Sequence, residues 1–210
     1  MTEWHTIETE ADVAEGADWL ARACPRLAHA LQMTGPPPLR RRADGFEALF
    51  NAIVSQQVSV ASAKAIWTKL EVAGMTDAKA IRHTSPENLR ALGLSRQKAR
   101  YAKALADARI DFDALRGASD EHVVKTLVAV PGIGVWTAEI YAMFSLGRPD
   151  VFAAGDLALQ EAARELYGLD ARPTEAQLRM MAADWSPWRS VAARLLFAYY
   201  RVIKQREGVS

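Results

Sequence analysis

The sequence lacks cysteine pairs, long hydrophobic runs and a strong excess of either charge, and each absence excludes a class of protein. Its 210 residues contain a single cysteine, Cys24, which excludes an intramolecular disulfide and any metal centre built from several cysteines. No hydrophobic run reaches membrane-spanning length, and the N-terminus has no basic start followed by an apolar stretch. We therefore expect a soluble cytoplasmic protein with no membrane contact.

Charge is balanced over the whole chain but not along it. Lys and Arg number 26 against 25 Asp and Glu. Residues 36–110 carry 13 basic and 6 acidic side chains, a net charge of +7, whereas residues 1–35 carry −4 and residues 111–210 carry −2. A basic middle segment suits a polyanion such as nucleic acid. A solvated basic face explains the same pattern equally well.

Helical periodicity and capping residues predict an all-α protein of about eight to ten helices. Asp44, with Glu47 three residues later, is typical of a capping box. Ser85-Pro86 and Ser186-Pro187 each predict an N-cap followed by proline at the first helical position. Gly35-Pro36-Pro37-Pro38 is the clear linker. Further caps are predicted at Ser95, Ser119 and Thr174, and helix ends at Gly93 and Gly168.

The stretch VPGIG, residues 130–134, separates two predicted helices at about 121–129 and 135–144. Its glycines, Gly132 and Gly134, predict a tight hairpin in which both adopt positive φ and leave backbone N–H groups uncovered. Together with the N–H groups at the start of the second helix, these groups form an anion site that fits a phosphate. Ile133 is expected to point back between the helices. A plain helix–helix turn is the alternative, but it needs only one glycine.

Five stretches together resemble the helix-hairpin-helix (HhH-GPD) DNA glycosylase superfamily, and within it the 3-methyladenine DNA glycosylase II group. They are FEALFNAIVSQQVSVASAKAIW (46–67), LGLSRQKARYAKALA (92–106), VPGIGVWTAEIYAMF (130–144), DVFAAGDLALQ (150–160) and WSPWRSVAARLLFAYY (185–200). The resemblance implies a single two-lobed helical module with the active site in the cleft between the lobes. Lobe one is expected at about 43–147, including the hairpin at 121–144, and lobe two at about 1–42 plus 148–210.

Asp156 is the predicted catalytic residue. The sequence alone predicts an N-cap for a helix over 157–167, and the resemblance places the family's catalytic aspartate there. A helix N-terminus favours an ionised carboxylate, which can stabilise the oxocarbenium character of the sugar and orient or deprotonate water. Family members that also cut the strand carry a Schiff-base lysine where Trp136 stands, and residues 126–147 contain no lysine. The resemblance therefore implies a monofunctional enzyme that leaves an abasic site.

The resemblance also implies a pocket for a flipped base. Trp136 is expected to stack on a cationic alkylated purine through cation–π attraction. A core position between helices is the alternative for this ring. The family's prototype carries a tyrosine where Ile140 stands, so the pocket is expected to be less aromatic. Phe197 and Trp188 are the other pocket candidates, although most aromatic residues of 185–200 are expected in the core.

Contacts with DNA are expected from two turns. Base flipping leaves a gap that a side chain must fill, and the resemblance assigns this wedge to the turn of Gln56 and Gln57, with Gln57 intercalating. A pair of turn or cap glutamines is the alternative. Phosphate contacts are expected from the hairpin and the start of the following helix. These hairpin residues are Gly132, Ile133, Gly134, Val135 and Thr137. The exposed side of the helix carrying Arg96, Lys98, Arg100 and Lys103 is a further candidate, or a solvated face.

No cofactor is expected to be required, and the lone cysteine excludes the four-cysteine iron–sulfur loop of the endonuclease III branch. Family hairpins often hold a monovalent cation, Na⁺ or K⁺, and the corresponding carbonyls belong to Val128, Val130 and Ile133. The expected partner is double-stranded DNA containing damaged bases, bound by a monomer. Two alternatives to an alkylated-purine glycosylase stay open: a non-catalytic protein that binds DNA structure through the hairpin, and a glycosylase for oxidised or deaminated bases.

Overall fold

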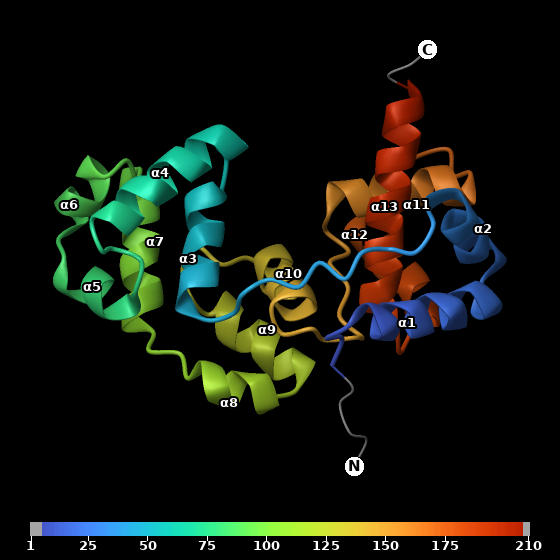
Figure 1. Cartoon of the computed structure of the whole chain (residues 1–210), viewed down its shortest axis with the longest axis horizontal. Helices are drawn as coiled ribbons and strands as arrows, with labels where there is room; N and C mark the ends of the chain where they lie inside the picture. Colours follow the sequence, from blue (N-terminus) through green and yellow to red (C-terminus); the bar gives the residue numbers. More distant parts are fainter. Residues whose placement is uncertain (1–5, 208–210) are drawn as a thin grey trace. The chain divides into compact units, whose positions relative to one another are not determined.

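The computed structural model describes residues 6–207, which form thirteen α-helices and one 3₁₀-helix (Figure 1). This described part of the chain has no β-strand, so the predicted all-α class is confirmed. The helices outnumber the expected eight to ten because three of them, α5, α6 and α8, are only six residues long. Within the described residues, none of the helices is long and apolar enough to cross a membrane.

The chain divides into two compact units, and the first consists of two separate chain segments. Unit 1 contains the described residues up to Arg41 and those from Ala142 onward, and unit 2 contains Arg42–Tyr141. The second division lies inside helix α10 (Val135–Phe144), whereas the expected lobe boundary followed residue 147.

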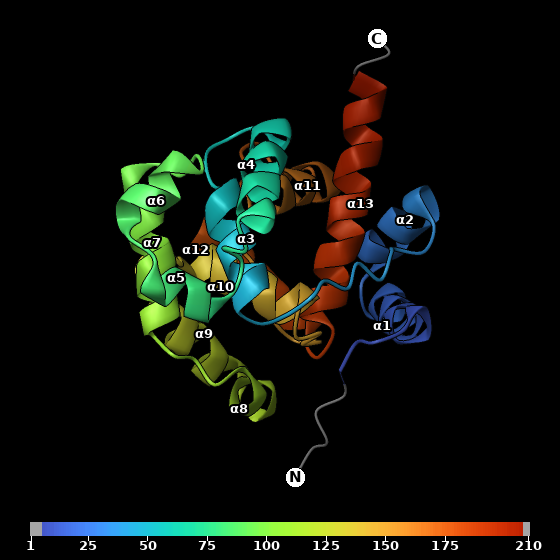
Figure 2. The same cartoon turned by 60° about the vertical axis from the view of Figure 1, so that its left-hand side comes forward.

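Unit 2 is built around helix α7 (Arg96–Asp107). Helices α3 (Phe46–Ser55), α5 (Ala78–His83) and α6 (Pro86–Ala91) pack against α7, and α4 (Val60–Val72) packs against α3 (Figures 1 and 2). Helices α8 (Phe112–Gly117) and α9 (Asp120–Val128) follow and lead to the hairpin. The core consists of apolar side chains at helical spacing. Each Å² of apolar surface that they bury stabilises the fold by about 25 cal/mol. The core includes Phe50, Ile53, Ile81, Leu89, Leu105 and Leu127, all at most 2% exposed.

Unit 1 is built around the long helix α13 (Arg189–Glu207). Helices α1 (Glu10–Ala23), α2 (Pro25–Thr34) and α11 (Leu157–Tyr167) pack against α13 (Figure 1). Helix α12 (Glu175–Met181) runs into the 3₁₀-helix η1 (Ala182–Trp185). The predicted core role of the C-terminal aromatic residues is confirmed for Trp185, Trp188 and Tyr199, which are 2%, 8% and 7% exposed.

Most predicted caps are confirmed. Ser85, Ser95 and Ser119 each accept a hydrogen bond from the backbone N–H three residues later. Thr174 and Gln177 form a full capping box. Gly168 ends α11 in the left-handed conformation, and Gly93, with φ 111°, follows α6.

Two predicted caps are wrong, and in both the side chain is hydrogen-bonded to a residue far away in the sequence. Helix α3 begins after Gly45, because the Asp44 carboxylate accepts hydrogen bonds from Arg116 of α8 at 2.6 and 3.1 Å. Helix α13 begins at Arg189, and the Ser186 hydroxyl donates to Asp150 at 2.8 Å.

Arg194 is a fully buried cation that joins three segments of unit 1. Its guanidinium donates to the carbonyls of Leu39, Met143 and Ser190 at 2.9–3.0 Å and lies 4.7 Å from the centroid of the Phe144 ring. Burial, together with nearby arginines, lowers the pKa of Arg194 to about 10. The Gly-Pro-Pro-Pro linker is therefore anchored to α13 through the Leu39 carbonyl.

Candidate functional site

Asp156 is the N-cap of α11, as the sequence predicts. Its Oδ1 accepts hydrogen bonds from the N–H groups of Ala158 at 2.8 Å and Leu159 at 3.2 Å, and the side chain is half-buried. The preceding turn is closed by a bond from the Asp156 N–H to the Ala153 carbonyl at 2.9 Å. A carboxylate held by two backbone donors at a helix N-terminus has a fixed direction.

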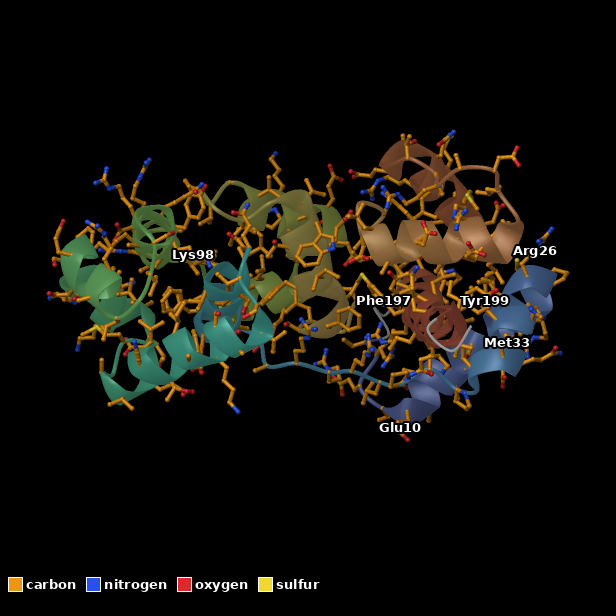
Figure 3. All side chains as sticks on the ribbon, turned by 90° about the horizontal axis from the view of Figure 1, so that it is seen from above. Glu10, Arg26, Met33, Lys98, Phe197 and Tyr199 are labelled. Carbon is orange, nitrogen blue, oxygen red and sulfur yellow. The ribbon has the colours of Figure 1, made fainter. Side chains whose placement is uncertain are left out.

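The two aromatic candidates of unit 1 have different surroundings. Phe197 is half-buried, with its ring centroid 6.3 Å from that of Phe144 and the Arg40 guanidinium 5.9 Å from the ring (Figure 3). Trp188 lies in the core, where a Cβ added to Gly16 would come within 2.6 Å of its ring. Trp188 therefore packs against α1, and its place in a base pocket stays a prediction.

The hairpin has the expected turn, but its two glycines differ. Gly132 has φ 98°, and a Cβ added there would lie 2.5 Å from ring carbon Cδ2 of Tyr101. Gly134 is exposed, lies outside the positive-φ region and has open space where a Cβ would point. The expectation of positive φ at both glycines is therefore wrong for Gly134. Gly132 is required by conformation and packing, whereas Gly134 leaves an uncovered surface.

Ile133 anchors the hairpin, as expected from the sequence. Its side chain is 4% exposed, and its N–H donates to the Val130 carbonyl at 3.0 Å. Both its side chain and its N–H are therefore engaged within the turn, and a DNA contact by Ile133 stays a prediction.

The start of α10 presents donors and a large ring. Ala138 makes the first α-helical bond, to the Gly134 carbonyl at 3.0 Å, so the N–H groups of Val135 and Thr137 lie in the first turn, where helices provide no backbone acceptor. The Thr137 side chain is 8% exposed, which leaves only its backbone for a contact. Trp136 is 47% exposed and therefore lies outside the core. Ile140, one turn further, is half-buried.

The two glutamines of the turn after α3 differ in exposure and in hydrogen bonding. Gln56 is half-buried, and its Nε2 donates to the Gly132 carbonyl at 2.9 Å. Gln57 is exposed and has φ 55°, a conformation that is uncommon outside glycine. The turn and the hairpin thus meet in unit 2, beside a pocket of about 510 Å³ that both line together with α7.

Two of the four basic residues of α7 are occupied within the protein. Lys98 is 9% exposed, its Nζ donates to the Val54 carbonyl at 2.7 Å, and burial lowers the pKa of Lys98 (Figure 3). Lys103 donates to the carbonyls of Ile81, Arg82 and Thr84. Both ammonium groups therefore cap the carbonyl ends of helices, and the exposed basic side of α7 is reduced to Arg96 and Arg100.

No local sequence pattern predicts the packing of Tyr101 against Gly132 or the bonds of Gln56 and Lys98. All three contacts join segments far apart in the chain. The only available hint was that these residues fall in stretches that carry the resemblance. Of the three carbonyls predicted to hold a cation, that of Val130 accepts the Ile133 N–H, and the cation site stays a prediction.

Comparisons with known proteins agree with this architecture. Residues 50–188 match the family model described as HhH-GPD superfamily base excision DNA repair protein. The chain is 30% identical over 171 residues to DNA-3-methyladenine glycosylase 2 of Escherichia coli, which covers 75% of this chain. The chain spans 57% of that relative's length and 40% of another bacterial relative's length.

Two solved structures share the fold over most of the chain. DNA-3-methyladenine glycosidase from Bacillus halodurans superimposes with a TM-score of 0.82 at 29% identity, covering 97% of this chain and 95% of that one. The 3-methyladenine DNA glycosylase Mag1 of Schizosaccharomyces pombe, solved with abasic DNA, gives a TM-score of 0.75 at 27% identity, covering 87% and 95%. The family match spans well over half of the sequence and includes the hairpin and Asp156. The chain belongs to the HhH-GPD superfamily of base excision DNA repair proteins.

Proposed function

We propose that this protein is a monofunctional DNA glycosylase that flips alkylated purines, of the 3-methyladenine and 7-methylguanine type, out of double-stranded DNA and hydrolyses their N-glycosidic bond. The observation that carries the proposal is the carboxylate of Asp156, held by two backbone N–H groups at the start of α11 in a chain of this family. The names of similar proteins support the alkylated-base substrate.

The chemistry assigned to Asp156 follows from its fixed negative charge. Breaking the bond between C1′ and the base nitrogen leaves positive charge on the sugar, and the electron pair of that bond departs with the base. A fixed carboxylate stabilises this charge and orients or deprotonates the water that adds to C1′. An alkylated purine that already carries positive charge leaves as a neutral base, so no strong general acid is needed.

DNA contacts are assigned to unit 2. The exposed Gly134 and the first-turn N–H groups of α10 suit a backbone phosphate. Gln57, exposed on a positive-φ turn, is the proposed wedge, and half-exposed Trp136 is proposed to stack on the flipped base. Ile140, one turn further along α10, is proposed to line the same pocket. Phe197, in unit 1, remains a predicted pocket residue.

Two further features of the family are carried into the proposal. The position of the Schiff-base lysine holds Trp136, which has no amine nucleophile, so we assign no strand cleavage. Carbonyl oxygens are ligands that Na⁺ and K⁺ accept, and Val128, Val130 and Ile133 would hold such an ion. The Val130 carbonyl accepts one hydrogen bond and retains a second lone pair for it. A bound cation would supply positive charge next to a phosphate.

The proposal is tested by Asp156→Asn, which keeps the capping oxygen but removes the charge. Single-turnover release of 3-methyladenine is expected to fall by at least ~10²-fold, while binding to abasic duplex survives. Asp77→Asn is the matched control, because Asp77 caps α5 through the same pair of backbone bonds. Its release rate is expected to stay at the wild-type value. A folded Asp156→Asn variant with wild-type release would refute the catalytic assignment and favour a non-catalytic DNA-binding role.

A further inference from the structure

The turn of residues 55–58 and the hairpin of residues 130–134 are joined by one side chain. Gln56 donates its amide N–H to the Gly132 carbonyl across 76 positions of sequence. Its neighbour Gln57 is exposed and has positive φ, whereas the backbone of Gln56 is extended. Adjacent glutamines therefore do different things: the amide of Gln56 is bonded to the protein, and that of Gln57 is directed outward.

The other side of the turn is fixed by α7. The ammonium of Lys98 reaches the Val54 carbonyl at 2.7 Å, in the last turn of α3, only three residues before Gln57. The last carbonyls of a helix carry partial negative charge, so a buried cation there holds the helix end in place. Tyr101, three residues further along α7, lies against Gly132 of the hairpin. Helix α7 thus contacts both the start of the turn and the hairpin that Gln56 reaches.

We propose that Gln56 and Lys98 are positioning residues, which lock the turn to the hairpin so that Gln57 enters the duplex at a fixed distance from the phosphate that the hairpin binds. This inference rests on the proposed function, because it takes Gln57 as the wedge. Filling the gap of a flipped base orders the inserting segment, and a segment that is already ordered loses less conformational entropy. The two bonds provide that order before DNA binds.

The test compares Gln56→Met with Gln97→Met. Methionine is close to glutamine in length but cannot donate to the Gly132 carbonyl. Gln97 lines the same pocket, and its amide donates to the Tyr101 hydroxyl on its own helix, so its replacement controls for losing an amide there. Single-turnover release is measured from a lesion in a matched duplex and from the same lesion in a mismatch, where flipping is easier.

Gln56→Met is expected to slow release from the matched duplex about fivefold, the scale of one lost hydrogen bond, and to leave release from the mismatch within about twofold. A purely structural role would slow both substrates alike, and that result would overturn the proposal. An equal effect of Gln97→Met on the matched duplex would overturn it too. Gln56→Glu, which keeps the shape but also lacks the donor, is expected to repeat the pattern and serves if Gln56→Met does not fold.

A double-mutant cycle with Gln57→Ala separates this inference from the proposed function. If Gln56 acts through Gln57, adding Gln56→Met to Gln57→Ala causes no further loss, whereas additive losses would overturn the positioning role. If Gln57→Ala alone slows matched and mismatched substrates equally, the wedge assignment fails, and the positioning role fails with it. A wild-type protein that binds duplex DNA but releases no base contradicts the proposed function itself.

Discussion

A methyl group added at Gly132 should destabilise the fold, whereas one added at Gly134 should leave the fold intact and weaken DNA binding. Gly132→Ala places a Cβ 2.5 Å from the Tyr101 ring and forces alanine to φ 98°. Unfavourable φ costs about 1–2 kcal/mol and overpacking about 1–3 kcal/mol. We therefore expect the free energy of unfolding to fall by about 3 kcal/mol. Gly134→Ala meets open space and an ordinary φ, so it should be neutral or stabilising by about 0.5 kcal/mol.

Urea denaturation followed by far-UV circular dichroism measures the change in the free energy of unfolding. The melting temperature of Gly132→Ala should lie roughly 10 °C below that of Gly134→Ala, at about 2–4 °C per kcal/mol for a chain of this size. Anisotropy with a short duplex measures the change in DNA affinity. Because the methyl of Gly134→Ala would stand where a phosphate is proposed to approach, affinity should fall about fivefold in a fully folded protein. Equal stability of the two variants would refute the packing argument, and unchanged affinity of Gly134→Ala would refute the phosphate assignment.

Two further predictions concern buried polar groups. Burial raises the pKa of Tyr141 to about 12, so the folded state keeps its proton above pH 10, where the unfolded state loses it. The contribution of Tyr141 to stability should be constant below pH 10 and decrease by about 2–3 kcal/mol between pH 10 and 12. Tyr141→Phe should weaken that decrease in urea titrations at each pH, and an unchanged slope would contradict the assignment. Arg194→Lys should lower the free energy of unfolding by about 2 kcal/mol, because one ammonium cannot replace a guanidinium that donates to three carbonyls. Wild-type stability in urea would show that these bonds are dispensable.

Bonds between residues close together in the chain could be predicted from the sequence. Ser85 and Thr174 cap helices through backbone groups three residues away, and Asp156 does so within three residues. Residue type and spacing suffice to predict such contacts. The failures at Asp44 and Ser186 have the opposite cause, since their partners lie 72 and 36 residues away. A short capping pattern carries no information about such competitors.

The same distinction explains the candidate site. The turn at VPGIG and the cap at Asp156 follow from local chemistry, so both were predicted. The bonds of Gln56 and Lys98 span 76 and 44 residues, and nothing in either residue's neighbourhood specifies them. The sequence pattern alone therefore places Lys98 and Lys103 on the exposed side of their helix, whereas packing makes them caps of neighbouring helices.

The two-segment construction of unit 1 has a consequence for the order of events on the ribosome. Helices α1 and α2 are synthesised first, yet they pack against α13, at the opposite end of the chain. The hundred residues of Arg42–Tyr141 lie between α2 and α13 in the sequence. They form a contiguous unit that can complete its own core as soon as it emerges from the ribosome. At about 5–20 residues per second, α1 and α2 wait on the order of 10 s for their partner. During nascent-chain synthesis, the middle of this protein is therefore expected to become protease-resistant before its beginning.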